Sequence, residues 1–290
     1  MLLKKALPCA LFEVGRCRHL EKAALRGGRF RIVDFPALVV LIQHPGHGPI
    51  LFDTGYADHF LSETRSFPER LYRLATPPRL LPEERLEAQL RRFGLRPEEI
   101  ELVLVSHLHA DHVAGLRDLP RARFLLRRRE LEAFRDLRGF AAVRRGFLPG
   151  LLPADFAARA SFVEDAPVAE LGPAWAPFER GYDLLGDGSL VGIPLPGHTP
   201  GQLGILLRAG DGRPLLLAAD ACWSRAAWRE DRPPSLLARP LMADWGDYCR
   251  QLAGLKMLAD RQPELHILPS HCPLSIAELH GSLGVPAWPR

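Results

Sequence analysis

The chain has 290 residues, enough for one large domain or two small ones and for a sizeable buried core. Hydrophobic residues make up 47% and charged residues 25%, and no apolar run approaches the roughly 18 residues that a membrane span needs. The net charge of +4 is modest and comes without a strong basic stripe. We therefore expect neither nucleic acid nor a membrane as a partner.

The cysteines bear on the cellular compartment. Their number is odd, and none of them forms a Cys-x-x-Cys pair, which fits reduced thiols better than a disulfide framework. They are Cys9, Cys17, Cys222, Cys249 and Cys272. Cytoplasmic localisation is the expectation.

In chain order, the first apolar run (residues 6–12) predicts a strand, because Pro8 interrupts it and Glu13 closes it too early for a secretion signal. Further strands are predicted at residues 38–42, 50–52, 102–105, 124–126, 190–195, 203–207, 215–219 and 266–268. Helical spacing predicts helices at about residues 82–94 and 247–260.

Strands and helices thus interleave, which indicates an α/β protein. Three stretches rich in Pro, Arg and aromatic residues, 56–81, 140–188 and 223–245, are expected to be irregular loops, and some of their apolar side chains could line a pocket or form a homodimer interface. No Ser/Gly linker divides the chain. We expect one domain over residues 1–290.

The most informative segment is Ser106-His107-Leu108-His109-Ala110-Asp111-His112, which follows the apolar run of residues 102–105. In an extended chain His107 and His109 can point the same way, and the turn that follows lets Asp111 and His112 face a nearby point. Burying four such polar groups without a partner would be costly. A metal site at the end of a strand is therefore predicted.

Other ligand candidates follow other apolar runs. His198 lies on a Gly/Pro-rich turn, Asp220 ends the run of residues 215–219, and His271 comes shortly after residues 266–268. A dinuclear site needs such additional ligands.

With these residues in place, nearly the whole chain resembles the metallo-β-lactamase superfamily. The motifs occur in the family's order: Asp53-Thr54-Gly55, His107-x-His109-x-Asp111-His112, Gly197-His198-Thr199-Pro200-Gly201, Asp220 and His271. The resemblance implies a four-layer αββα sandwich with metals at one edge of its two sheets.

Carried over residue by residue, the resemblance implies that one Zn²⁺ is bound by His107, His109 and His198. A second Zn²⁺ would be bound by Asp111, His112 and His271, with Asp220 bridging the two ions, although Fe or Mn suits such ligands as well. Asp53 would orient a ligand histidine. Asp111 and Asp220 are the expected catalytic carboxylates, and the implied reaction is hydrolysis by a metal-bridging hydroxide.

Within the superfamily the chain is most similar to the N-acyl homoserine lactonases, the quorum-quenching enzymes. The implied substrate is a small acylated lactone, opened at its ring ester. In that group a tyrosine commonly stands where this chain has Trp223, and Ala110 is small where a bulky residue is frequent. We expect Trp223, Ala110 and Tyr56 to contact substrate.

Three other functions are considered. A phosphodiesterase or nuclease is disfavoured, because no strong basic stripe is visible. An acyl-thioester or ester hydrolase of the glyoxalase II kind would use the same metals, with arginines such as Arg65, Arg70 or Arg225 binding a phosphate of the carrier. A catalytically inactive metal-binding module is the remaining alternative, disfavoured because all seven ligands are present.

Overall fold

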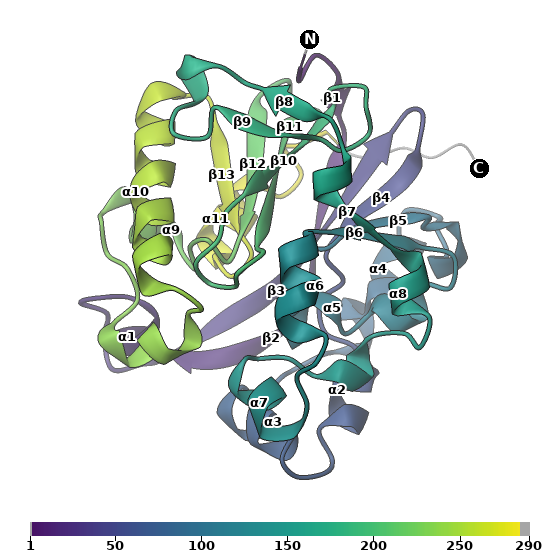
Figure 1. The fold of residues 1–290 in the computed structure, drawn as a ribbon, viewed down its shortest axis with the longest axis vertical. Coiled ribbons are helices and arrows are strands. Elements are labelled where there is room, and N and C mark those ends of the chain that lie inside the picture. The colour runs from purple at the N-terminus through teal and green to yellow at the C-terminus, as the bar shows by residue number, and fades with distance from the viewer. Residues whose placement is uncertain (1, 285–290) are drawn as a thin grey trace.

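The protein is described by a computed structural model that covers residues 2–284. Two β-sheets face each other, and helices cover their outer faces (Figure 1). This is the αββα arrangement that the sequence predicts.

One sheet is formed mainly by the first half of the chain. Its strands, in spatial order, are β2 (Cys9–Leu20), β3 (Ile32–His44), β4 (Gly48–Phe52), β5 (Leu102–Leu104), β6 (Arg123–Leu126) and β7 (Ala160–Phe162). β2 to β4 are antiparallel, whereas β4 to β7 are parallel, and Phe52 is paired with Leu104. The parallel strands therefore end at one edge of the sheet.

The second sheet contains most of the later strands. In spatial order these are β13 (His266–Pro269), β12 (Pro214–Ala219), β11 (Leu203–Ala209), β10 (Leu190–Pro194), β9 (Arg180–Asp183) and β8 (Val168–Glu170), with β1 (Ala6–Leu7) paired to β11. β12 and β13 are parallel to each other. β10 runs in the same direction as β12, because both strands are antiparallel to β11.

The longest helix, α10 (Trp245–Arg261), lies on the outer face of the second sheet, and the Asp244 side chain caps it by accepting the Asp247 N–H. The other α-helices are α1 (Glu21–Ala24), α2 (Asp58–Glu63), α3 (Arg70–Ala75), α4 (Leu86–Arg91), α5 (Ala110–Val113), α6 (Arg128–Phe134), α7 (Gly139–Arg144), α8 (Phe156–Arg159), α9 (Arg225–Arg229) and α11 (Pro273–Leu279). Short 3-10 helices include η1 (Pro82–Glu84) and η7 (Leu236–Leu241).

Three apolar cores separate the four layers. Because side chains alternate along a strand, Leu215 and Leu217 of β12 pack between the sheets, whereas Leu216 packs against α10. In the same way Leu51 of β4 points to the helices on the other side, while its neighbours Ile50 and Phe52 point inward. Both sheets are thus buried on both faces, which explains their continuous apolar runs.

The structure corrects two expectations about local structure. The helix expected at residues 82–94 is divided into η1 and α4, because Arg85 has extended backbone angles (φ −59°, ψ 142°). The stretch 140–188 contains β7, β8 and β9, which are only three or four residues long and therefore give little periodicity. Within residues 2–284, no helix combines the length and apolar character needed to cross a bilayer.

Candidate metal centre

The predicted ligands meet because several strands end at the same edge of the two sheets. His107 follows β5 and Asp53 follows β4, while Asp220 and His271 follow the parallel pair β12 and β13. His198 follows β10, on the turn between β10 and β11. All seven predicted ligand residues fall into three overlapping groups whose ligand atoms lie within 4.8 Å of one another.

One group consists of His107, His109 and His198. Nε2 of His198 lies 2.9 Å from Nδ1 of His109, so that the two rings converge on one point. His109 packs against Gly146, where any Cβ would come within 2.9 Å of the imidazole. The glycine therefore lets the ring reach its position.

A second group consists of Asp111, His112 and His271. The third group, Asp220 with His107 and His112, shares one residue with each of the other two. Oδ2 of Asp220 lies 3.2 Å from Nε2 of His198, and Oδ1 lies 3.2 Å from Nε2 of His271. One carboxylate thus faces both groups, as a bridging ligand would.

Three histidines are oriented by partners of their Nδ1 atoms, which leaves Nε2 facing the site. Nδ1 of His112 lies 2.7 Å from Oδ2 of Asp53, and Nδ1 of His271 lies 2.7 Å from the carbonyl oxygen of Pro36. Nδ1 of His107 lies 2.9 Å from the Ser106 hydroxyl oxygen. Contacts of this kind hold metal-binding imidazoles in one tautomer.

Asp53 has a larger role than an ordinary turn residue. It adopts a positive φ of 60° and is completely buried. Its two carboxylate oxygens also accept hydrogen bonds from the backbone N–H and the hydroxyl of Ser106. This strained residue therefore holds both His112 and the start of the histidine motif.

The electrostatics of the cluster suit a cation. Burial holds the pKa values of His107 and His198 well below the usual histidine range, so these rings are neutral, which is the form that binds metal. Burial would raise the pKa of Asp220, but the imidazoles of His271 and His112, whose own pKa values are raised, outweigh it and hold this pKa well below its usual value. Asp220 is therefore ionised.

The donor atoms also pass a simple test of fit. Nε2 of His107, Nε2 of His112 and Oδ1 of Asp220 are buried and have no hydrogen-bond partner. Buried polar atoms are rarely left unpaired, and these three face one another in a cluster of imidazole and carboxylate ligands. The residues present therefore fit a pair of divalent cations.

Sequence reasoning missed Glu130. This fully buried side chain at α6 accepts the Leu108 N–H at Oε1 (3.0 Å) and the Gly201 N–H at Oε2 (2.9 Å). It thereby ties the loop that carries His107 and His109 to the turn that carries His198. No local sequence pattern distinguishes Glu130 from the acidic helix residues that most often lie in solvent.

An open cavity leads to the cluster, with His109, Asp111, His198, Asp220 and His271 among its lining residues. Trp223 and Tyr56 line it as well, and their contact with substrate stays a prediction. Ala110 does not: it is fully buried at the start of α5 and packs in the helix-side core. The expected contact between Ala110 and substrate is therefore not supported.

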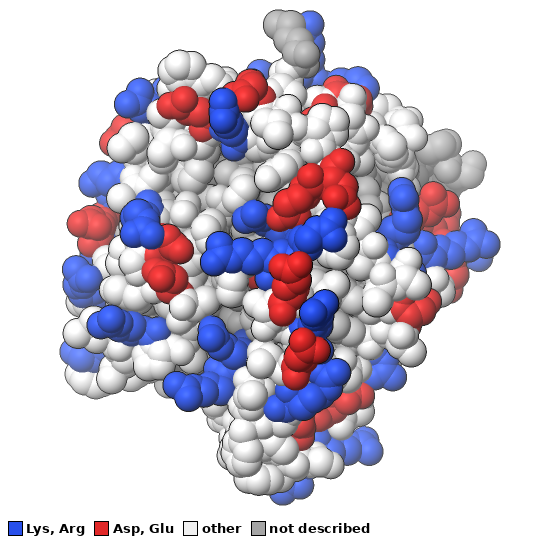
Figure 2. All heavy atoms as spheres, in the orientation of Figure 1, with Lys and Arg blue, Asp and Glu red and all other residues white. Residues whose placement is uncertain are grey.

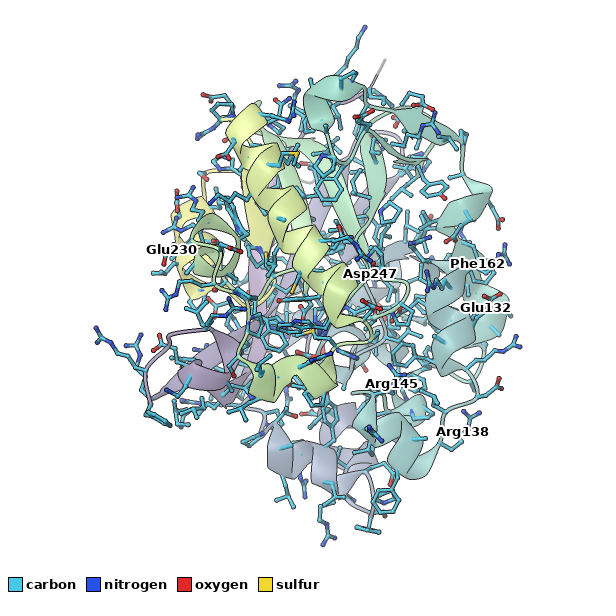
Figure 3. The ribbon with its side chains drawn as sticks, turned by 60° about the vertical axis from the view of Figure 1, so that its left-hand side comes forward. Glu132, Arg138, Arg145, Phe162, Glu230 and Asp247 are labelled. Carbon is cyan, nitrogen blue, oxygen red and sulfur yellow. The ribbon has the colours of Figure 1, made fainter. Side chains whose placement is uncertain are left out.

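The arginines at the cavity also differ from those expected. Arg144 and Arg145 line it, whereas Arg65, Arg70 and Arg225 are not among its lining residues. Arg225 forms an ion pair with Glu278 instead. In Figure 3, Arg145 lies near the centre of the molecule and Arg138, on the same segment, lies at its outer edge.

A four-layer sandwich with a His/Asp cluster at the shared edge of its sheets indicates a metal-dependent hydrolase. Residues 32–259 match the metallo-beta-lactamase superfamily, to which the chain belongs. Among curated relatives, it is 30% identical over 232 residues to N-acyl homoserine lactonase AttM of Azorhizobium caulinodans (79% of each chain). It is 29% identical to AttM of Rhizobium radiobacter (83% of each chain).

Solved structures agree on the fold. An AiiA variant from B. thuringiensis, with N-decanoyl-L-homoserine bound at its active site, superimposes with a TM-score of 0.67 at 18% identity and 99% coverage of both chains. AidC, a dizinc quorum-quenching lactonase in complex with a product, gives a TM-score of 0.61 at 16% identity, covering 92% of this chain and 88% of the other.

Proposed function

We propose that this protein is a metal-dependent lactonase that opens the ring of an N-acyl homoserine lactone. The observation that carries the proposal is the convergence of all seven predicted ligands, five of which line an open, largely apolar cavity. The curated relatives named N-acyl homoserine lactonase support this choice of substrate.

We assign His107, His109 and His198 to one cation and Asp111, His112 and His271 to the other, with Asp220 between them. Zinc suits these nitrogen and oxygen ligands best, and Fe or Mn would fit the same set. When bound there, such a pair of cations would supply a hydroxide nucleophile near neutral pH and polarisation of the ester carbonyl.

The protein's own side chains position the reactants. Asp53 and Ser106 hold the histidine motif, and Glu130 joins it to the turn of His198. The indole N–H of Trp223 is directed at Asp220. Apolar residues of the cavity, such as Phe35 and Leu241, would contact the acyl chain.

Ring opening by metal-loaded protein is the decisive test. Zinc-loaded protein is incubated with a long-chain N-acyl homoserine lactone, and mass spectrometry measures the gain of one water against a chelated control. Metal-dependent opening is expected. Absence of opening by protein with two bound cations would overturn the proposal.

A second candidate, hydrolysis of an acyl thioester, is favoured by one observation. Arg144 and Arg145 line the cavity, where their guanidinium groups could bind a phosphate of a thioester carrier. Hydrolysis of acyl-coenzyme A in the same assay, with lactones unchanged, would establish it. Absence of turnover on both substrates would instead support the inactive metal-binding module.

Three broader expectations belong to this proposal. We treat residues 1–290 as one domain, since both sheets contribute ligands to the same cluster. All five cysteines are free thiols, which supports a cytoplasmic location. The homodimer stays a prediction, which light scattering tests directly.

A further inference from the structure

Four short segments surround the cavity mouth, and we call them together the rim: residues 21–31, 65–79, 135–145 and 235–242. Each contributes lining residues to the cavity, among them Ala24, Tyr72, Arg144 and Leu237. Within the rim, α1 contacts η7 and α3 contacts α7. Figure 1 shows these helices together at the lower end of the molecule, around the site edge of the sheets.

The rim concentrates exposed apolar side chains. Of the thirteen large apolar side chains that are strongly exposed within residues 2–284, eight lie on it: Phe30, Phe67, Leu71, Leu74, Phe140, Leu236, Leu237 and Leu241. The rings of Phe67 and Phe140 pack edge to face across the junction of α3 and α7. Grouped exposed apolar residues of this kind mark interaction surfaces, whereas isolated ones are ordinary.

The rim is also strongly basic. It carries thirteen Lys and Arg residues and three Asp and Glu residues, whereas the rest of the chain carries 25 and 31. The net charge of +4 therefore conceals a positive rim on an otherwise negative protein. Figure 2 shows part of this surface, with uncharged atoms over the lobe of α3 and α7 and mainly blue side chains at the lower left, where α1 and η7 lie.

We propose that the rim is a docking surface for an anionic lipid bilayer, so that the cavity opens toward the membrane. Arginines would bind the headgroup phosphates, and the apolar tips of residues such as Leu74 and Phe140 would enter the interface, as in peripheral proteins that combine both features. Contact is peripheral and requires no membrane-spanning helix. An acylated substrate partitioned into the bilayer would reach the cavity without crossing water.

The charge and the exposed apolar side chains of the rim favour an anionic bilayer over a second copy of the chain or a nucleic acid. A second copy that presented the same rim would bring two strongly positive surfaces together, and like charges oppose association. A nucleic acid would satisfy the arginines but would leave exposed aliphatic tips such as Leu236 without a partner. The sequence gives no sign of the rim, because its four segments are far apart along the chain. This proposal therefore departs from the expectation that no membrane is a partner.

Vesicle co-sedimentation tests the proposal with the full chain and without substrate, so its failure is distinct from a failure of the lactonase proposal. Vesicles of phosphatidylcholine alone are compared with vesicles containing a quarter phosphatidylglycerol. We expect binding to the anionic vesicles only, and weakening of that binding as salt is raised, since headgroup attraction is screened.

Matched variants locate the contact. Leu74→Ser/Phe140→Ser removes two rim side chains that are 69% and 60% exposed, and Val168→Ser/Leu274→Ser removes two that are 61% and 68% exposed elsewhere. Only the rim pair should weaken binding, by about tenfold. Arg65→Gln/Arg73→Gln, which removes two rim charges, should also weaken vesicle binding by about tenfold. The control pair outside the rim, Arg121→Gln/Lys256→Gln, should leave binding unchanged.

Four results would overturn the proposal. One is an absence of binding to anionic vesicles at low salt by folded protein. Another is equal loss of binding in the rim and control pairs. The third is a dimer by light scattering that Leu74→Ser/Phe140→Ser converts to a monomer, which would show that a second copy covers the rim. Binding that heparin abolishes but the apolar pair leaves unchanged would also overturn it, in favour of a polyanion.

Discussion

The indole N–H of Trp223 donates a hydrogen bond to Oδ2 of Asp220 across 2.9 Å. Asp220 is the carboxylate that faces both histidine groups, so this bond withdraws part of its negative charge and fixes its rotamer. In lactonases a tyrosine is common at this position. Here the indole cannot act as a practical acid, and its role is to hold the carboxylate.

Replacing Trp223 by Phe therefore tests a positioning role. We expect kcat/KM for lactone to fall by roughly ten- to a hundredfold, because a hydrogen bond to a charged group contributes about 1.5–3 kcal/mol. Initial rates are measured at equal metal content. Trp245→Phe serves as the control, since that ring stacks on Tyr248 away from the cavity. Equal rates in wild type and Trp223→Phe would contradict the role.

Asp220→Asn should lower turnover by at least about a hundredfold while leaving the fold intact, because an amide cannot serve as an anionic ligand to two cations. Circular dichroism verifies the fold, and elemental analysis verifies metal content. Wild-type turnover by a folded, metal-loaded Asp220→Asn protein would refute the assignment of Asp220.

Metal removal should destabilise the protein by several degrees in Tm. Buried Nε2 of His107, Nε2 of His112 and Oδ1 of Asp220 have no hydrogen-bond partner, so their desolvation is uncompensated without a cation. Thermal scans with and without chelator measure the change, and added zinc should restore the Tm. A chelator already saturated with zinc is the control, and a Tm that chelation leaves unchanged would argue against a bound cation.

Glu130 should give the stability a distinct pH dependence. Burial raises the pKa of Glu130 to about 7, from 4.5. Between these values the folded protein retains a proton that the unfolded chain has released, so the contribution of Glu130 to the free energy of unfolding declines as pH rises and is level above pH 7.

Glu130→Gln removes this titration. The unfolding free energy of wild type minus that of Glu130→Gln should therefore decline by roughly 3 kcal/mol from pH 4.5 to 7. Urea unfolding at a series of pH values, at constant metal loading, measures this difference in unfolding free energy. A hydrogen bond that is lost in Glu130→Gln changes the difference by the same amount at every pH. A difference that is flat with pH would show that Glu130 is ionised throughout.

Gly201 should not tolerate a methyl group. A Cβ there would come within 2.3 Å of the Glu130 backbone nitrogen, whereas at Gly46 the nearest atom would be 3.7 Å away. Gly201→Ala should therefore lower the free energy of unfolding by about 2 kcal/mol or more, and Gly46→Ala should change it little. Denaturant unfolding compares the two, and a neutral Gly201→Ala would mean that the turn moves away from α6 without cost.

Much of the chemistry could be predicted from the sequence. Apolar runs of five or more residues revealed β10, β11 and β12, because strands buried on both faces are continuously apolar. The placement of His107, Asp220 and His271 at or shortly after the ends of apolar runs revealed ligand candidates, since parallel strands end at one edge. The resemblance to the superfamily supplied the sandwich and the pairing of ligands with two cations.

Other features depend on contacts between distant segments. Glu130 acts through backbone groups 22 and 71 residues away, and no local pattern distinguishes it from a solvated helix residue. Ala110 lies beside metal ligands in the sequence but is turned into the core, because α5 begins there. Strands as short as β7 and β8 owe their form to pairing with neighbours, which outweighs their weak propensity.

The sequence by itself thus determined the type of ligands and the strands that they follow, because both are local properties of the chain. Only the tertiary structure decided which groups orient those ligands, which arginines reach the cavity, and that a modest net charge divides into a basic, apolar rim and an acidic remainder. These properties arise where segments separated by tens to hundreds of residues pack together. Overall composition and net charge do not show how such residues are distributed in space.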